Sequence, residues 1–240
     1  MRLHLHASSL WRRGRQLLDG LEVKIEAGQC WALLGENGSG KSSLLLALAD
    51  AEPELRFVGT PPRWQPALND WRTRALWRSL ARQHIEVAPG LRVRDVLALV
   101  STAVPVCARA WGLEALLSCR LSELSGGQLQ RLELARSWAQ IEARAGLWLL
   151  DEPFNHLDMR AQVDLARHIR AYCRAGGAVM FSSHALAPAR RLASAVLMLA
   201  AGRQLACGDV TLLDDAQLIE RLYQVTPEEL AELTGSGLAH

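Results

Sequence analysis

The sequence of 240 residues contains no hydrophobic run long enough to cross a bilayer. Its longest apolar runs, such as 195–201, fall far short of the ~20 residues that a membrane-spanning helix needs. The first ten residues interleave His4 and His6 with apolar residues, which is not the pattern of a signal peptide. We therefore expect a soluble protein that stays in the cytoplasm.

A strong charge imbalance and paired cysteine motifs are also missing. The chain has 27 basic and 25 acidic residues without a long block of either sign, so no nucleic-acid partner is expected. With 50% hydrophobic and 22% charged residues it has an ordinary globular balance, and it is long enough to bury a sizeable core. Five cysteines without a C-x-x-C pair indicate reduced, mostly structural thiols: Cys30, Cys107, Cys119, Cys173 and Cys207.

Lysine is scarce, and one of the two lysines stands in a distinctive place. Lys24 and Lys41 are the only lysines, whereas arginine is abundant. Lys41 belongs to 35–42, which has the form G-x-x-x-x-G-K-S and lies between the apolar runs 31–34 and 44–48. A buried strand that leads into a glycine-rich loop and then a helix is the context of a P-loop. The alternative is a glycine-rich turn with an incidental Lys-Ser.

The chemistry of a P-loop explains these residue types. Glycines let successive backbone N–H groups point inward around a β-phosphate, and the helix N-terminus adds its positive dipole end. Lys41 would reach the β- and γ-phosphates, and the Ser42 hydroxyl would ligate Mg²⁺. The predicted nucleotide contacts of this loop are Gly35, Asn37, Gly38, Ser39, Gly40, Lys41, Ser42 and Ser43.

A second glycine-containing loop, Leu-Ser-Gly-Gly-Gln at 124–128, precedes a helical pattern at 129–136. Ser125 and the two glycines offer unhindered N–H groups at a helix N-terminus, which makes a second anion site without a lysine. Because the loop lies far from Lys41 in the chain, it need not face its own P-loop. It could instead close over the P-loop of a second copy. The alternative is an unrelated Ser-Gly-Gly helix cap.

The 124–128 stretch resembles the signature sequence of the ATP-binding cassette (ABC) ATPases, a motif far more specific than a P-loop alone. In that family, two cassettes sandwich two ATP molecules head to tail, each between one P-loop and the partner's signature loop. The resemblance implies that four residues contact ATP held by a second copy: Ser125, Gly126, Gly127 and Gln128.

Two carboxylates follow the apolar run 147–150 and are similar to a Walker B segment with its catalytic glutamate. Asp151 would hold Mg²⁺, and Glu152 would polarise the water that attacks the γ-phosphate. A pair of acids at a strand end also occurs as a helix cap. The fully apolar run that leads into this pair disfavours that interpretation.

Three further positions match the order of the family's motifs. Asp158 matches the aspartate of the D-loop. His184, which follows an apolar strand at 178–182, matches the switch histidine that contacts the γ-phosphate. Gln83 falls where the family has its Q-loop glutamine, which implies that it senses Mg²⁺ and the attacking water.

Trp11 is a candidate for stacking on the nucleotide base, because an aromatic face holds adenine without reading its hydrogen bonds. A tryptophan packed on the sheet is the equally weighted alternative. Counting back from 18–20, the aromatic residue of the family would fall nearer Arg12 than Trp11.

The predicted fold is an α/β P-loop NTPase of ABC type: a parallel-sheet core with an N-terminal antiparallel β region and a small helical subdomain. We expect one ABC ATPase domain over 1–240, in which 1–91 and 124–240 form the α/β core with the β region and 92–123 the helical subdomain. The chain pattern further predicts a helix from 68 to about 80, a helix over 159–173, a hairpin at 196–208 and a short helix at 227–233.

The resemblance implies a homodimer that binds ATP and Mg²⁺ and hydrolyses ATP. It also implies that force passes to separate transmembrane permease subunits at the cytoplasmic face of the (inner) membrane, with 83–94 as the docking segment. The segments 129–131, 151–158 and 221–225 are similar to the importer ATPases for cobalamin, ferric siderophores and haem, which implies metal-chelate import and a substrate-binding protein as a further partner.

Other classes stay open at this point. The helical segment is short for those importers, which leaves an ABC exporter, a haem-delivery system or a soluble non-transport ABC ATPase as alternatives. A P-loop nucleotide kinase would leave the signature loop and His184 without roles. The transported molecule is not identified by this sequence, because that specificity resides in other chains.

Overall fold

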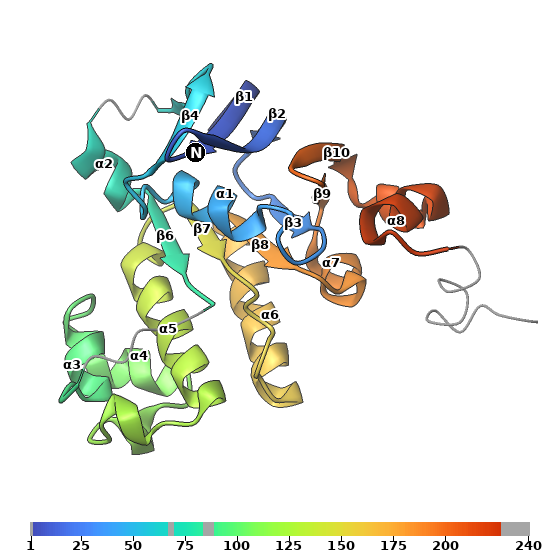
Figure 1. Cartoon of the computed structure of the whole chain (residues 1–240). Coiled ribbons are helices and arrows are strands. Elements are labelled where there is room, and N and C mark those ends of the chain that lie inside the picture. Colours follow the sequence, from blue (N-terminus) through green and yellow to red (C-terminus); the bar gives the residue numbers. More distant parts are fainter. Residues whose placement is uncertain (1, 67–69, 84–88, 227–240) are drawn as a thin grey trace, which may run out of the picture.

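The computed structural model describes residues 2–66, 70–83 and 89–226. Ten strands are found there: β1 (Arg2–Arg12), β2 (Arg15–Ile25), β3 (Cys30–Leu34), β4 (Leu55–Gly59), β5 (Arg63–Gln65), β6 (Arg78–Ala81), β7 (Leu147–Leu150), β8 (Ala178–Ser183), β9 (Ala195–Ala200) and β10 (Arg203–Asp209). They form one sheet in the order β4-β1-β2-β10-β9-β3-β8-β7-β6, and β5 pairs with β1 (Figure 1).

The half of the sheet from β9 to β6 is parallel, and its strands are buried and largely apolar, apart from the first two residues of β6 and the last two of β8. A parallel sheet is covered on both faces, so its strands carry continuous apolar runs instead of an alternating pattern. The side chains of β3 divide between two cores: Cys30, Ala32 and Leu34 face one cluster, and Trp31 and Leu33 face the other. The carboxyl ends of β3, β7 and β8 therefore meet along one edge.

The other half of the sheet is antiparallel except for the parallel pairing of β10 with β2. β1 pairs with β2, β4 and β5, and its burial pattern alternates near its start. The tight connection between β1 and β2 uses Arg13 and Gly14, both with positive φ. This antiparallel region beside a parallel core confirms the predicted fold class.

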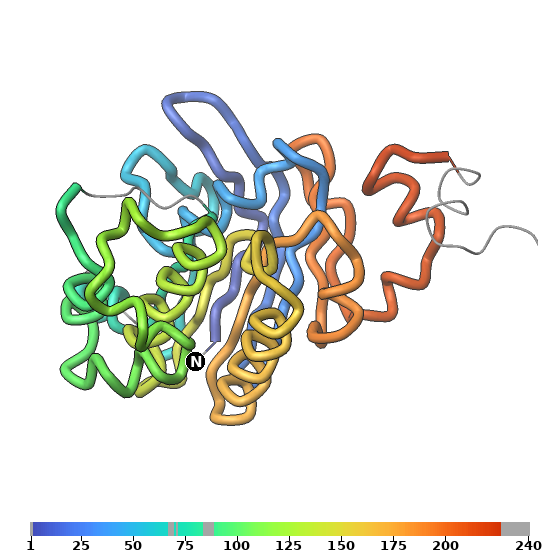
Figure 2. The backbone as a smooth tube through the Cα atoms, turned by 90° about the horizontal axis from the view of Figure 1, so that it is seen from below, coloured from blue at the N-terminus to red at the C-terminus, as the bar shows by residue number. Residues whose placement is uncertain are grey.

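The helices are α1 (Lys41–Leu48), α2 (Trp71–Leu76), α3 (Val93–Ala98), α4 (Val104–Ala110), α5 (Gly126–Ile141), α6 (Met159–Arg174), α7 (Leu186–Leu192) and α8 (Ala216–Tyr223), with 3₁₀ turns at Glu114–Leu116, Leu121–Glu123 and Val210–Asp214. The segment with α3 and α4 lies at one end of the molecule and α8 at the other (Figures 1 and 2). Within the described ranges, no helix combines the length and apolar character that crossing a membrane requires.

One predicted helix is wrong in its second half. α2 ends at Leu76, and Arg78–Ala81 forms the edge strand β6 beside β7. The Trp77 carbonyl accepts the Leu147 N–H at 2.8 Å, and the Arg78 guanidinium is buried against the Leu48 carbonyl and Asp50. Sheet pairing and this buried ion pair therefore override the helical spacing.

Two of the other local predictions are confirmed, and the rest are not tested. α6 and the β9–β10 hairpin confirm the helix expected at 159–173 and the hairpin expected at 196–208. The helix expected at 227–233 lies outside the described residues, as do positions 84–88 of the predicted docking segment. The division into a core and a 92–123 subdomain stays a prediction.

Candidate functional site

The glycine-rich loop joins the end of β3 to the start of α1, as the motif predicts. Gly35 has φ +152°, and a Cβ there would lie 2.3 Å from the Leu199 carbonyl oxygen. Gly40 has φ +104° and caps α1, and a Cβ there would lie 2.6 Å from the Leu18 side chain. Both positions therefore require glycine, which keeps the loop tight against the sheet and directs the first N–H groups of α1 into the site.

Lys41, the first residue of α1, is only 6% exposed. Its ammonium donates hydrogen bonds to the carbonyl oxygens of Gly35 at 2.7 Å and Glu36 at 3.0 Å. Its Nζ also lies 3.9 Å from Glu152 Oε1. Burial lowers the pKa of Lys41, and the nearby carboxylates oppose that shift. A partly dehydrated cation of this kind binds phosphate more strongly than one in open water.

Ser42 and Asp151 belong to one hydrogen-bonded network. The Ser42 hydroxyl donates to Asp151 Oδ1 at 3.1 Å. The Ser182 hydroxyl also donates to Asp151 Oδ1, at 2.6 Å, and accepts the Glu152 N–H at 2.8 Å. The fully buried Ser182 thus fixes both residues that follow β7. Sequence reasoning missed Ser182, although a polar residue at the end of the neighbouring strand β8 was a usable signal.

The donor set at this edge fits Mg²⁺. Ser42 and Asp151 supply hard oxygen ligands from two neighbouring elements. Mg²⁺ in nucleotide sites is held by one or two protein oxygens together with phosphate oxygens and waters, so two protein donors are sufficient. Of the predicted metal residues, Ser42 and Asp151 contact each other directly.

Glu152 follows in an unusual backbone conformation. Its φ is +46°, in the left-handed region that non-glycine residues seldom adopt, and its side chain is buried. Glu152 Oε2 lies 3.1 Å from His184 Nδ1, and the His184 side chain is 54% exposed. A buried glutamate with a strained backbone, whose N–H is held by Ser182 and whose carboxylate is held by His184, is typical of a catalytic group.

Lys41, Ser42 and Glu152 line one hollow of about 330 Å³, whereas Asp151 and Ser182 are not among its lining residues. Its walls bring together most of the P-loop residues with Gln83, Glu152 and His184, as the motifs predict. Asn155 also lines it, and the sequence pattern had not marked that residue as a site residue. The lining residues are Asn37, Gly38, Gly40, Lys41, Ser42, Ser43, Gln83, Glu152, Asn155 and His184. Gly35 and Ser39, the other two predicted P-loop contacts, are not among the lining residues and lie against each other, since a Cβ on Gly35 would be 2.6 Å from Ser39 Oγ.

The signature loop lies apart from this hollow. Ser125 caps α5, and its Oγ accepts the Gln128 N–H at 3.3 Å, while Gln128 Oε1 accepts the Ser125 N–H at 2.8 Å. Ser125 and Gly126 are exposed, and none of the four predicted contacts lines the site. Gly127 packs on the backbone, because a Cβ there would lie 2.6 Å from the His156 carbonyl oxygen.

Trp11 also lies apart from the P-loop. It is paired with Gln16 and Arg56 in the antiparallel region and lines a different hollow, with Arg13 and Pro53. Its indole N–H is buried and has no partner among the described residues. Base stacking by Trp11 stays a prediction.

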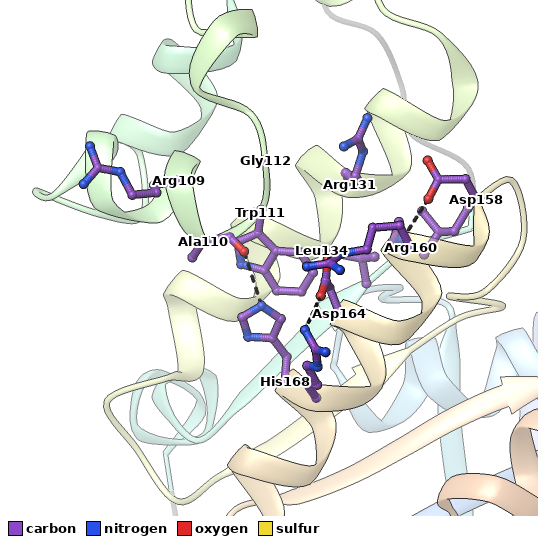
Figure 3. A pocket seen from close by; sticks show the side chains of 13 residues that line it. Arg109, Ala110, Trp111, Gly112, Arg131, Leu134, Asp158, Arg160, Asp164 and His168 are labelled. Carbon is purple, nitrogen blue, oxygen red and sulfur yellow. Dashed lines mark hydrogen bonds and ion pairs between the residues drawn. The ribbon is translucent and has the colours of Figure 1, made fainter.

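A larger hollow of about 540 Å³ lies between the end of α4, α5 and α6 (Figure 3). Trp111 and His168 stack there with ring centroids 4.3 Å apart, and Arg131 and Arg160 line it as well. No residue of the P-loop reaches this hollow. The phosphate site is therefore marked by its convergent N–H groups and charges, and not by its size.

Comparisons with known proteins agree on one family. A family model described as ABC transporter matches residues 18–155. A hemin import ATP-binding protein HmuV from Rhodopseudomonas palustris (strain BisB18) is 32% identical, over 93% of this chain and 88% of that protein. An HmuV from Streptomyces coelicolor is 35% identical, over 88% of this chain and 79% of that protein.

Solved structures show the same fold. An ATP-binding subunit of an ABC transporter superposes with a TM-score of 0.78 at 23% identity, covering 98% of this chain and all of that one. A nucleotide-free ATP-binding cassette from an ABC transporter has a TM-score of 0.74 at 16% identity, covering 92% and 98% of the two chains.

Proposed function

Since the chain belongs to the ABC transporter family, in which it is an ATP-hydrolysing subunit that energises transport, we propose that it drives import of a metal chelate, with haem as the favoured cargo. The observation that supports haem is that curated relatives at 32% and 35% identity, aligned over most of both chains, are hemin import ATP-binding proteins. Cobalamin and ferric siderophores are the other chelates that the sequence resemblance implies. The likeness to an exporter cassette, at 20% identity, concerns the fold alone and does not favour export.

In the proposed hydrolysis site, the N–H groups of the P-loop and the Lys41 ammonium bind the phosphates of ATP. Ser42, Asp151 and Gln83 would hold Mg²⁺, which neutralises charge that develops on the phosphate oxygens. Glu152 orients and polarises the attacking water. His184, 3.1 Å from Glu152 at the exposed side of the hollow, holds the glutamate and faces the γ-phosphate.

The site is completed by a second copy of the chain in this proposal. Ser125 and Gly126 are exposed and outside the phosphate hollow, so they are available to a nucleotide held by another copy. Permease subunits at the cytoplasmic face of the membrane would dock near 83–94, and a substrate-binding protein would deliver the chelate to them.

An affinity pull-down of the tagged chain from solubilised membranes of its own host tests the transport role. We expect a polytopic permease to co-purify, and Leu91→Asp in the docking segment to lose it. Val58→Asp is the matched control, because Val58 is also an exposed apolar side chain, 50% exposed against 37% for Leu91, but lies on β4. Recovery only from the cytosol, with ribosomes, nucleic acid or nothing, would contradict the transport role.

The cargo is tested separately by deleting the gene and measuring uptake of haem, a ferric siderophore and cobalamin. We expect haem uptake to fall and to return when the wild-type chain, but not Glu152→Gln, is supplied. A loss confined to the siderophore or to cobalamin would keep the chelate-importer role and replace the favoured cargo. Unchanged uptake of all three chelates would overturn the chelate-importer role.

A further inference from the structure

The end of α8 lies against the P-loop, although the two segments are nearly a full chain length apart in sequence. α8 follows the β9–β10 hairpin and a 3₁₀ turn, beyond the residues 18–155 that the family model matches. Ile219 and Leu222 are buried in the same apolar cluster as β3, which fixes the helix on the core. Its last turn is therefore a rigid platform beside the nucleotide site.

Gln224 ends α8 in a conformation that suits glycine better than glutamine. Its φ is +51°, in the left-handed region, and the Val225 N–H closes the turn on the Glu220 carbonyl at 3.2 Å. Glycine would adopt this conformation with less strain. Gln224 Nε2 donates a hydrogen bond to Glu36 Oε2 at 2.5 Å.

Glu36 is the second residue of the P-loop, and its backbone shapes the phosphate cradle. Its carbonyl oxygen accepts the Lys41 ammonium at 3.0 Å and the Ser39 N–H at 3.2 Å. A hydrogen bond from a neutral amide to a carboxylate is stronger than one between neutral groups. Fixing the Glu36 side chain therefore limits the movement of the turn that holds Lys41 in place.

Tyr223 is the residue before Gln224. Its hydroxyl is buried and has no hydrogen-bond partner among the described residues, and its side chain packs against the apolar cluster that contains Ile219 and Leu222. Burial raises the pKa of Tyr223, and the negative charge of Glu152 raises it further, so Tyr223 stays neutral. The end of α8 is thus close to both the P-loop and the glutamate of the hydrolysis site.

We propose that Gln224 is a positioning residue for ATP binding, which acts through Glu36 and ties the C-terminal helix to the P-loop. The proposal rests on the ATPase activity of the chain and does not depend on the cargo. Because the tie shapes the cradle and does not touch the reacting atoms, it stabilises bound ATP equally in the ground and transition states.

Gln224→Ala tests this in a steady-state ATPase assay. We expect KM for ATP to rise about 3- to 10-fold, the value of one net hydrogen bond, with kcat within about two-fold. Gln204→Ala is the matched control, because Gln204 is another side chain that ties two segments, with its Oε1 accepting the Glu22 N–H at 2.8 Å, and it does not line the site. We expect its KM to be unchanged.

Exchanging the hydrogen-bond donor and acceptor between Gln224 and Glu36 distinguishes a positioning role of Gln224 from a merely structural one. Gln224→Glu alone places two carboxylates together and should raise KM at least as much as Gln224→Ala. Combining Gln224→Glu with Glu36→Gln reverses the donor and the acceptor and should return KM to within about two-fold of the wild type. An unchanged KM in Gln224→Ala, a loss of kcat at constant KM, or a double variant that is not rescued would each overturn the proposal.

Discussion

The P-loop and the signature loop have the same local design but opposite surroundings. Each is a glycine-containing loop at a helix N-terminus, with unhindered N–H groups that suit an anion. Around the P-loop, Lys41, Asp151 and Glu152 are all about 6–7% exposed and joined by hydrogen bonds or close charge contacts. Around the signature loop, Ser125 and Gly126 are exposed, and the side-chain hydrogen bonds of the cap stay within the loop.

The difference follows from charge. Buried charges need partners within the same chain, because an unpaired one would destabilise the fold by several kcal/mol. The network of Ser42, Asp151, Ser182 and Glu152 meets that requirement. The signature loop carries no charged side chain and satisfies its own cap, so it tolerates exposure until another surface covers it. The charges around the first loop are therefore paired within one copy, and the second loop fits the proposal that another copy covers it.

The largest effect is expected from Glu152→Gln, which changes the buried surroundings of the P-loop. The amide keeps the size of the side chain and its contact with His184, but it cannot polarise water as a carboxylate does. We expect phosphate release to fall at least about 100-fold, while ATP binding persists and a dimer accumulates. Measurements of turnover, nucleotide binding and molecular mass check this prediction.

The control for that experiment is Glu22→Gln. Glu22 also forms a glutamate–histidine pair, with its Oε1 3.2 Å from His6 Nδ1, but the pair is exposed on the surface. Its turnover should match the wild type. Wild-type turnover in Glu152→Gln would remove Glu152 from the catalytic role.

A smaller effect is expected from Gly127→Ala, which changes the exposed signature loop. The added Cβ would lie 2.6 Å from the His156 carbonyl oxygen, so the signature loop must shift. We expect turnover to fall about 10-fold, while ATP binding to a single copy stays within about two-fold, because the P-loop is remote. Turnover and binding at low protein concentration are the measurements.

Gly208→Ala is the matched control for Gly127→Ala. A Cβ at Gly208 would meet only the Leu212 side chain, at 3.0 Å, and not backbone as at Gly127. If Gly127→Ala weakens ATP binding by a single copy as much as it slows turnover, the two loops are not independent, and the comparison drawn above fails.

The sequence predicts the parts of this site that are local. The P-loop, the acids after β7 and the cap of α5 are each contained in a few consecutive residues. The approach of the acids to the P-loop is also predictable, because carboxyl ends of parallel strands share one edge.

The parts that escaped prediction depend on long-range contacts. Ser182 became important only because β8 lies beside β7, and Gln224 only because α8 ends near Glu36. The strand β6 was taken for helix because four residues carry little periodicity, and its pairing with β7 decides its conformation. Contacts of this kind depend on the fold, so the local pattern shows at most a polar residue, as at the end of β8, and not the partner that it contacts.

The smallest expected effect concerns His168, which lies in the larger hollow, outside the phosphate site (Figure 3). It stacks on Trp111 and its Nε2 lies 3.4 Å from the Ala110 carbonyl oxygen. Burial lowers its pKa from 6.5, while the Ala110 carbonyl and Asp164 oppose the shift. Below about pH 6.5 the unfolded chain therefore binds this proton more readily than the folded chain, and stability is lost as pH falls.

His168→Gln should remove that part of the acid sensitivity and leave kcat at neutral pH unchanged, because His168 is remote from the reacting groups. Between about pH 7 and about pH 5, we expect the Tm of the wild type to fall more than that of the variant, by no more than about 2 °C. His6→Gln controls for the loss of a titrating group, because His6 is an exposed histidine whose ring lies beside Glu22. Equal Tm curves for the wild type and His168→Gln would show that protonation of His168 does not couple to folding. A loss of kcat in His168→Gln would instead connect the larger hollow to the hydrolysis site, which the separation of the two hollows argues against.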